Sequence, residues 1–308
     1  MHLLDDSLNR ITQWMKKFQP RHMESFIPGL SRQEIYNQLK TLNVSIPEEI
    51  YELYQWRNGR EKLPFVNCAF SPSFYDFLSI DEIVNEYDLL NNPDCLSARE
   101  NKGHRFIPLF GGSTHEVYGQ TIDIYDGKTT FFSMLFEEDG SLEFYCNSIR
   151  SMLCTWADAC ETGAYRIVDE VEVEGHMVPL IEEDSDLVAP LLRKNNPGVA
   201  ERAVEDITLL GSLSEAVDEN VSTRIINALR LLQRYKHPSA SNIISESIER
   251  NRNLFSYKNQ NILCFVSATL GDLSDKRAIK ALTTILSKTG SEQVKLHAED
   301  SISRLINQ

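Results

Sequence analysis

Long apolar runs are missing from this chain of 308 residues. The longest are short stretches such as Phe131–Phe136, well below the ~20 apolar residues that a membrane-spanning helix needs. The first ten residues, MHLLDDSLNR, have two aspartates and no basic cluster, so a secretory signal is not expected. These absences predict a soluble protein of the cytoplasm.

Paired cysteine motifs are missing as well. The six cysteines stand at positions 68, 95, 146, 154, 160 and 264, and none forms a C-x-x-C pair. Because Cys160 falls on the apolar face of a predicted helix, we expect buried free thiols rather than a metal site or disulfides. No metal and no cofactor are expected.

The common catalytic motifs are also absent, among them G-x-S-x-G, the phosphate-binding loop and H-E-x-x-H. Ser113, His115 and Glu116 come closest to a catalytic cluster, but neighbouring strand residues point to opposite faces and cannot converge. The acidic turn at 137–139 is interpreted as a solvated hairpin tip rather than a cation site. We therefore expect no enzyme, and an unrecognised hydrolase stays the alternative.

What the chain does have is ordinary globular composition with a large acidic excess. Hydrophobic residues make up 42% and charged residues 25% of it, and 45 acidic against 31 basic side chains give a net charge of −14. Such a chain repels phosphate backbones, so a nucleic acid is a poor partner and a basic protein is the natural complement. Acidity that serves solubility alone is the alternative.

The acidic charge is concentrated between residues 161 and 186, where Arg166 is the single basic residue among nine acids. A run of like charge is typical of a solvated, partly extended connector. We therefore divide the chain into an α+β domain at 1–165, an acidic connector at 166–190 and a helical domain at 191–308. The expected partner-binding residues are Trp56, Glu170, Glu172, Glu174, Glu182, Glu183, Asp184 and Asp186.

In the first part, helix signals precede strand signals. Capping boxes stand at 31–34 and 79–82, a helix is expected over 4–18, and Pro47 opens another that Asn58–Gly59 should end. Apolar alternation then predicts strands near 122–125, 129–136 and 142–146, joined by Asp-Gly turns. A closing helix from Ile149 should end at Gly163. Trp14 and Trp156 fall on the apolar faces of the helices at 4–18 and from 149, so both are expected in the core. This order favours an antiparallel sheet flanked by helices.

The second part carries helix signals and no convincing strand. Pro197–Gly198 opens a first helix. Apolar residues then recur at spacings of three and four residues, which predicts further helices over 221–235, 239–250, 259–270, 276–288 and 292–306. Ala240–Ile248 aligns with Ala278–Leu286, and Ala228 precedes Ala268 by 40 residues. The spacing is close to the ~40–47 residues of HEAT-like helix pairs, which we expect here, with an ordinary helical bundle as the alternative.

Four segments of the first part together resemble the SUKH superfamily, the Smi/Knr family of yeast cell-wall regulators and bacterial immunity proteins. They are IPEEIYELYQWRNG (46–59), FLSIDEI (77–83), IPLFGGSTHEVYGQTIDI (107–124) and SIRSMLCTWADACETGAY (148–165). The resemblance covers residues 25–165 and implies an α+β binding domain without catalytic residues. The matching positions, expected to be scaffold, are Asn58, Gly59, Gly111, Gly112 and Asp123, and the Gly pair is expected to form a tight turn. The helical half is a departure from the short family members.

These observations lead to a functional hypothesis. We expect a non-enzymatic immunity protein that neutralises a toxin domain by covering the basic cleft of the toxin with an acidic face. The resemblance implies that the toxins opposed by such proteins are often nucleases. The alternative is a regulatory scaffold of the Smi/Knr type whose helical repeats recruit a second protein.

Overall fold

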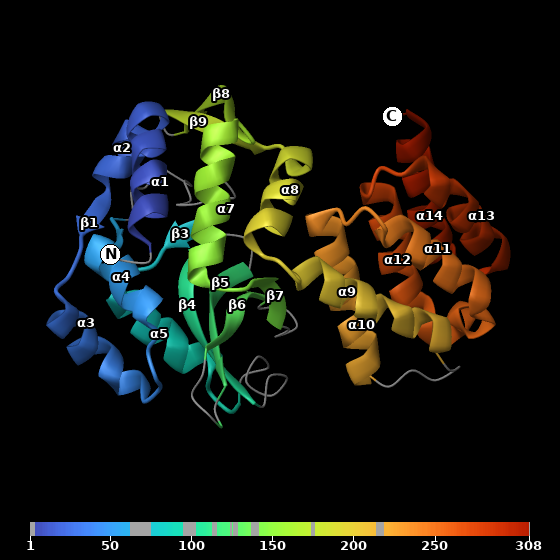
Figure 1. The fold of residues 1–308 in the computed structure, drawn as a ribbon, viewed down its shortest axis with the longest axis horizontal. Coiled ribbons are helices and arrows are strands. Elements are labelled where there is room, and N and C mark those ends of the chain that lie inside the picture. Colours follow the sequence, from blue (N-terminus) through green and yellow to red (C-terminus); the bar gives the residue numbers. More distant parts are fainter. Residues whose placement is uncertain are drawn as a thin grey trace. The chain divides into compact units, whose positions relative to one another are not determined.

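The computed structural model describes residues 4–61, 75–94, 103–112, 116–123, 125, 129–136, 142–173, 176–213 and 219–307. They form a mixed α/β structure with small antiparallel sheets and many helices (Figure 1). The chain divides into two compact units, Met1–Asn196 and Pro197–Gln308. Every helix within these described ranges is too short or too polar to span a membrane.

The helices of the first unit begin where the sequence offers capping residues. The side chains of Ser31 and Ser79 each accept the backbone N–H three residues later at 3.3 Å, as the capping boxes predict. The first five α-helices of this unit are α1 (Asp5–Phe18), α2 (Pro20–Glu24), α3 (Arg32–Leu39), α4 (Glu48–Trp56) and α5 (Ile80–Leu90), and the 3-10 helix η1 (Lys40–Leu42) follows α3. The predicted end of α4 is wrong: the helix stops at Trp56, and Asn58–Gly59 lie in strand β2 (Arg57–Arg60).

A five-stranded antiparallel sheet follows in the order β3-β4-β5-β6-β7. Its strands are β3 (Tyr75–Phe77), β4 (His104–Gly112), β5 (Glu116–Asp123), β6 (Thr129–Phe136) and β7 (Leu142–Cys146). The bounds of β6 and β7 are those predicted, whereas β3 and β4 were not predicted. Both predicted Asp-Gly turns lie outside the described residues.

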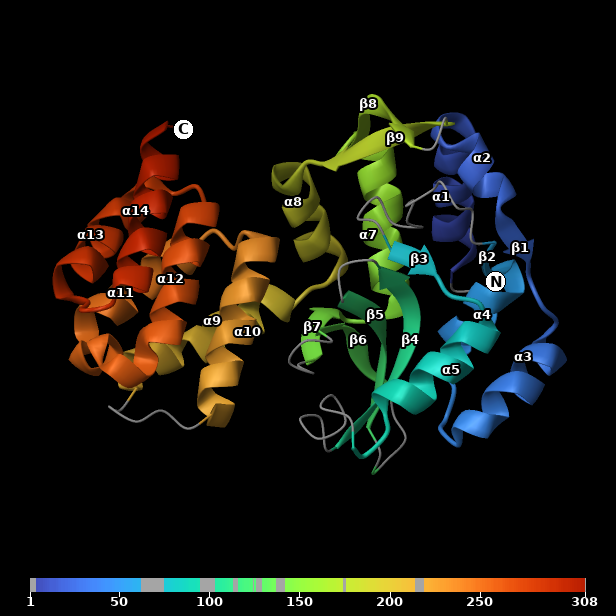
Figure 2. The same ribbon diagram turned by 180° about the vertical axis from the view of Figure 1, so that it is seen from behind.

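Helix α7 (Ile149–Thr162) crosses one face of this sheet, in front of it in Figure 1 and behind it in Figure 2. It contacts β6 and β7, while α5 contacts β4. Gly163 ends α7 in the left-handed conformation, with φ 76°, as predicted.

A series of aromatic side chains runs through the core of the first unit. The ring centroids of Tyr54 and Phe77 lie 5.0 Å apart, those of Phe77 and Phe110 5.3 Å, and those of Phe110 and Trp156 5.5 Å. The buried Tyr54 hydroxyl donates to the Leu78 carbonyl at 2.7 Å, which satisfies its polar end. The series therefore joins α4, β3, β4 and α7 through one continuous apolar contact.

The segment expected as an extended connector, 166–190, has regular secondary structure instead. Strands β8 (Tyr165–Val173) and β9 (His176–Glu183) form an antiparallel pair, which helix α8 (Ser185–Asn195) follows. All three belong to the first unit, and the division between units falls after Asn196 rather than at 165 or 190. A second small pair joins β1 (Phe26–Pro28) to β2.

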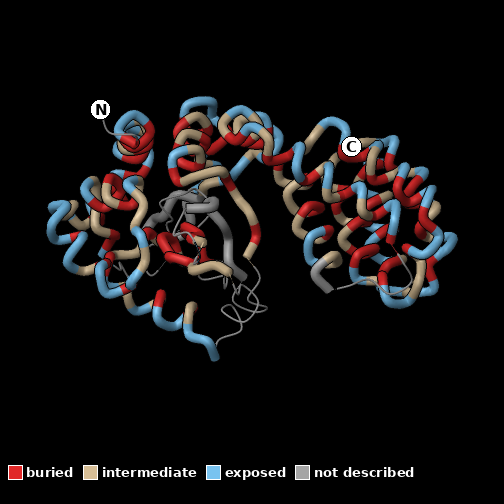
Figure 3. The backbone as a smooth tube through the Cα atoms, turned by 60° about the horizontal axis from the view of Figure 1, so that its bottom comes forward, coloured by how far each residue is buried: buried red, intermediate tan, exposed pale blue. Residues whose placement is uncertain are grey.

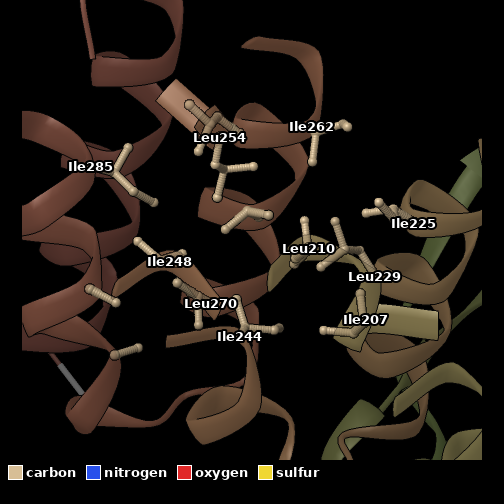
Figure 4. Close-up of a cluster of buried hydrophobic side chains, with 14 of the residues drawn as sticks. Ile207, Leu210, Ile225, Leu229, Ile244, Ile248, Leu254, Ile262, Leu270 and Ile285 are labelled. Atoms are coloured by element: carbon tan, nitrogen blue, oxygen red, sulfur yellow. The ribbon is translucent and has the colours of Figure 1, made fainter. Parts of the chain in front are cut away.

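The second unit, over its described residues 197–213 and 219–307, consists of helices. They are α9 (Val199–Ile207), α10 (Glu219–Tyr235), α11 (Ala240–Arg250), α12 (Gln260–Asp272), α13 (Ile279–Lys288) and α14 (Glu292–Asn307), with short 3-10 segments η2 (Thr208–Ser212), η3 (Arg252–Phe255), η4 (Tyr257–Asn259) and η5 (Lys276–Ala278). Helix α12 contacts α10 and α14, and α11 contacts α9 and α13. Buried positions recur along each helix (Figure 3), and their leucines and isoleucines meet in one core (Figure 4).

The turns between these helices follow a regular spacing. Gly198, Lys236 and Ser274 all have positive φ, at 82°, 43° and 56°, and each follows the one before by 38 positions. These three are the residues of the second unit, within its described ranges, that adopt this conformation. The turns thus put the period at 38, two residues shorter than the spacing inferred from Ala228 and Ala268.

The second and third turns also share their hydrogen bonds. His237 Nδ1 accepts the Ser239 backbone N–H at 3.3 Å, and Asp275 Oδ1 accepts the Arg277 backbone N–H at 3.0 Å. Since 275 follows 237 by the same 38 positions, one turn geometry is built twice with different side chains.

Candidate functional site

The acidic hairpin, defined as Tyr165–Glu183 with its strands β8 and β9, carries most of the residues expected to bind a partner. Its register sets Tyr165 opposite Glu183 and Arg166 opposite Glu182. The Arg166 guanidinium donates to the Glu182 carboxylate at 2.8 and 3.0 Å, and both side chains are more than half exposed. Glu182 therefore contributes less net negative charge to a partner than an unpaired glutamate would.

The remaining predicted acids divide among different places. Glu170 and Glu172 lie on β8 opposite Pro179 and Met177, but their side chains are outside the described part of the chain, as is the whole of Glu174. Glu183 is exposed at the end of β9. The exposed Asp169, on β8, joins this surface although it was not among the predicted residues.

Two of the predicted acids belong to helix α8 instead. The Asp184 carboxylate accepts the backbone N–H groups of Asp186 and Leu187 at 3.1 and 3.2 Å, so it caps the helix. Asp186 is exposed in the first turn, where a negative charge stabilises the helix dipole. Asp184 has a structural role that its charge alone did not indicate.

Trp56 lies at the end of α4 in an aromatic cluster. Its ring centroid is 5.5 Å from that of Phe26 and 6.3 Å from that of Phe77. The Arg57 guanidinium lies over the same ring at 5.4 Å. The half-buried Trp56 thus packs against the core on one side, which limits what it can offer to a partner.

Asn58 and Gly59 hold α4 and α5 together. The Asn58 side-chain oxygen accepts the Ile80 backbone N–H at 3.0 Å, at the start of α5. Gly59 has φ 74°, and a Cβ there would lie 2.4 Å from the Ser79 nitrogen. Both residues therefore act as scaffold at the place where the two segments meet.

The other three scaffold positions lie in the sheet. Gly111 and Gly112 are the last residues of β4, where they pair with Asp76 and Tyr75 of β3, so the Gly pair belongs to a strand and not to the expected tight turn. The Asp123 carboxylate accepts the Tyr125 backbone N–H at 2.7 Å at the end of β5.

A groove of about 600 Å³ lies beside the acidic hairpin, and the residue patterns did not predict it. Its walls come from α1, the end of α7 and the start of β8. Trp14 is half-buried and Phe18 is 39% exposed, with their ring centroids 5.3 Å apart. The groove is lined by Arg10, Gln13, Trp14, Lys17, Phe18, Cys160, Glu161, Gly163, Tyr165, Arg166 and Ile167. The prediction that Trp14 belongs to the core is wrong.

Ion pairs fix one wall of this groove. Arg10 donates to Glu161 at 2.5 and 2.8 Å and to Asp158 at 2.6 Å, which ties α1 to α7 and raises the pKa of the Arg10 guanidinium. Burial opposes it, but hydrogen bonds from Lys194 and Arg10 lower the pKa of Asp158 to about 2. Together these ion pairs hold α1, which carries Trp14, against α7.

The chemistry of the groove suits binding rather than covalent catalysis by its thiol. Burial raises the pKa of the Cys160 thiol to about 12, so the nucleophilic thiolate is scarce at neutral pH. Within the described ranges, no group of three His, Cys, Asp or Glu residues is placed to hold a metal ion. Aromatic rings and fixed charges around a cavity of this size are typical of a ligand or side-chain binding site.

Comparison with known proteins assigns no family to this chain. No protein-family model matches this chain, and no curated protein matches it significantly. A function is therefore inferred from the residues of the chain itself.

Proposed function

We propose that this protein is a non-enzymatic binding protein whose partner is a basic protein domain, and that it acts as an immunity protein against a toxin. The observation that carries the proposal is the position of the α1–β8 groove, lined by Trp14 and Phe18, next to the acidic hairpin. Arg166 and Ile167 of the hairpin form part of the groove, so charge and apolar surface are continuous there.

The two features have different roles in this proposal. The charge of the acidic hairpin attracts a basic partner and speeds the encounter. The groove then receives a large side chain of the partner, because buried aromatic or arginine anchors supply most of the energy at protein interfaces. Asp169 and Glu183 are exposed beside it and favour a basic rim on the partner.

The resemblance to the SUKH superfamily supports the same proposal. Asn58 and Gly59 join α4 to α5, and the chain then enters an antiparallel sheet that α7 crosses, the order that the resemblance implies. Bacterial members of that family neutralise toxins through binding alone. We accordingly propose that residues 25–165 form a SUKH-like domain.

For the second unit we propose a HEAT-like repeat array. The 38-residue spacing of Gly198, Lys236 and Ser274 supports it, as do the contacts of α12 with α10 and α14 and of α11 with α9 and α13. The second candidate function, a Smi/Knr-type scaffold with two partners, is favoured by the same observation, because such arrays commonly present a separate binding surface.

The test uses the protein encoded beside this chain, isolated as its complex from the native host. Asp169→Lys with Glu183→Lys reverses two exposed charges of the acidic hairpin, and we expect the Kd measured by calorimetry to rise about tenfold at low salt. The affinity of the unaltered protein should itself fall as salt rises, because screening weakens exposed charges.

A matched control reverses two exposed acids away from the hairpin, Glu24→Lys and Asp88→Lys, and should leave the affinity within about twofold. Equal losses in both variants, or an affinity independent of salt, would contradict an interface at the acidic hairpin. Trp14→Ala separately tests the groove and should weaken binding at every salt concentration.

A further inference from the structure

The lining of the α1–β8 groove contains three cationic side chains and one carboxylate. Arg10 donates to the Glu161 carboxylate at 2.8 Å. Arg166 donates to the Glu182 carboxylate at 2.8 and 3.0 Å. Two of the three cations are therefore matched by carboxylates, and the third, Lys17, is left to be explained.

Lys17 has an aromatic ring as its partner rather than a carboxylate. The exposed side chain leaves α1 so that its Nζ lies 4.7 Å from the centroid of the Phe18 ring. Among the residues that the structure describes, no carboxylate pairs with this ammonium group. Contact with a ring does not neutralise a positive charge. Lys17 therefore offers a cation at the wall of the groove.

Two aromatic rings beside Lys17 offer an apolar surface. The ring centroids of Trp14 and Phe18 lie 5.3 Å apart, with their planes inclined at 47°. Because Trp14 is half-buried and Phe18 is exposed, both rings keep surface that an occupant can cover. Aromatic rings pack on one another in offset or edge-to-face arrangements, and removing ring surface from water is favourable. The rings therefore favour an aromatic occupant.

The charges of the lining discriminate between the possible anchors. A carboxylate next to an aromatic ring would find Lys17 without competition. An arginine anchor would instead place a second cation beside Lys17, and Arg10 already holds the Glu161 carboxylate of the lining at 2.5 and 2.8 Å. Like charges brought together in this way oppose binding.

We propose that the α1–β8 groove receives an aromatic side chain of the partner that is followed by an acidic residue. The ring packs against Trp14 and Phe18, and the carboxylate pairs with Lys17. The inference rests on the proposed function and specifies its anchor. The partner is then basic where it meets the acidic hairpin and acidic beside its anchor, an alternation of charge that fixes the register of the complex.

The experiment uses capped dipeptides and the full chain, so it needs no partner protein. N-acetyl-Trp-Glu-amide carries the ring and the carboxylate, N-acetyl-Trp-Gln-amide replaces the carboxylate with a neutral amide, and N-acetyl-Trp-Lys-amide reverses the charge. Each is titrated at low salt into isotope-labelled protein, and binding is followed by NMR at the indole N–H signal that Trp14→Phe removes.

We expect saturable binding at millimolar concentration. The glutamate dipeptide should bind about threefold more tightly than the glutamine dipeptide, and the lysine dipeptide about threefold more weakly, as an exposed ion pair allows. Rising salt should weaken the glutamate dipeptide and leave the glutamine dipeptide unchanged. N-acetyl-Ala-Glu-amide, which lacks the ring, should not shift the Trp14 signal.

Lys17→Met removes the charge and should make the glutamate and glutamine dipeptides bind equally. Lys16→Met is the matched control, because it removes the neighbouring exposed lysine of α1, which does not line the groove. This control should keep the preference for the glutamate dipeptide.

The inference is overturned if no tryptophan dipeptide binds, if all three bind equally, or if Lys16→Met abolishes the preference as fully as Lys17→Met does. Failure of the proposed function gives a different result. The charge reversals at Asp169 and Glu183 would then leave the affinity for the partner unchanged, while the dipeptides would still be distinguished by the groove.

Discussion

At the scale of single residues, Gly59 and Gly163 share a backbone conformation but not their surroundings. Their φ angles are 74° and 76°, while a Cβ would lie 2.4 Å from the Ser79 nitrogen at Gly59 and in open space at Gly163. We predict that Gly59→Ala lowers the free energy of unfolding by more than about 3 kcal/mol, since steric conflict adds to left-handed strain.

Gly163→Ala is the control for strain alone and should lose only about 1 kcal/mol, as measured by urea unfolding. Equal losses would show that the contact with Ser79 relaxes without penalty.

His22 makes a second prediction, on pH. The side chain is 2% exposed, and neither ring nitrogen has a hydrogen-bond partner. Burial, and then the positive charge of Arg60, lower the pKa of His22 to about 3. The folded protein keeps this ring neutral, whereas the unfolded chain takes up a proton below about pH 6.5. Stability is therefore lost as the pH falls from 6.5 towards 3.

Between pH 7 and pH 5 the neutral His22 ring lowers the free energy of unfolding by about 2 kcal/mol. His22→Asn should remove that part of the pH dependence in urea unfolding curves. His297→Asn changes an exposed histidine and should leave the pH dependence as it is. If the free energy of unfolding of His22→Asn depends on pH as that of the unaltered protein does, the His22 ring is hydrated in the folded state.

Apolar spacing along a helix predicts which side it buries, but not where the buried surface stops. Trp14 lies between Ile11 and Met15, which are buried, and was assigned to the core with them. The groove leaves its ring half-buried, because α7 and β8 meet α1 without filling that space. Three separate segments form this site, so no local pattern signals it.

At the scale of elements, α8 depends on a residue that charge alone would assign to a partner. The Asp184 carboxylate caps the helix through two backbone N–H groups. We predict that Asp184→Asn keeps the stability of the protein, because asparagine caps as well as aspartate, while Asp184→Ala loses about 1 kcal/mol.

Thermal unfolding of both variants gives the comparison, and partner affinity should not change in Asp184→Asn. A tenfold weaker complex with an unchanged melting temperature would instead assign the charge of Asp184 to the interface.

Local sequence signals correctly predicted the helices whose ends are marked by a capping box or a glycine. The capping boxes at Ser31 and Ser79 and the glycine after α7 each mark a boundary by a hydrogen bond or a backbone angle. Strand β4 was missed because Phe106, Ile107, Leu109 and Phe110 are all buried, which leaves no alternation to detect.

The acidic hairpin was missed for a different reason. Valines at 171 and 173 alternate with glutamates at 170 and 172, a pattern typical of a strand. The like charge of the segment suggested a solvated connector instead. In the structure the two strands supply each other's backbone hydrogen bonds, so the like charge of the segment does not prevent pairing.

At the scale of the whole molecule, the charge and the two units divide at the same place. Residues 1–196 contain 17 basic and 32 acidic side chains, and residues 197–308 contain 14 and 13. A strong dependence of binding on salt therefore belongs to the first unit, and the second is close to neutral.

The second unit also has a core of its own, which includes Ile207, Leu229, Ile248 and Leu270. We predict that residues 197–308 alone fold cooperatively, with a single helical melting transition by circular dichroism. A gradual, featureless loss of helix signal would show that this core needs the first unit.

The equal spacing of the positive-φ turns gives the helical unit a modular length. Tyr235 and Leu273 each precede such a turn, at Lys236 and Ser274. Excising residues 236–273 would join Tyr235 directly to Ser274 and bring α13 into the place of α11, with no new loop to design. The protein could thus be shortened by one 38-residue helix pair, so the number of helix pairs could be varied by engineering.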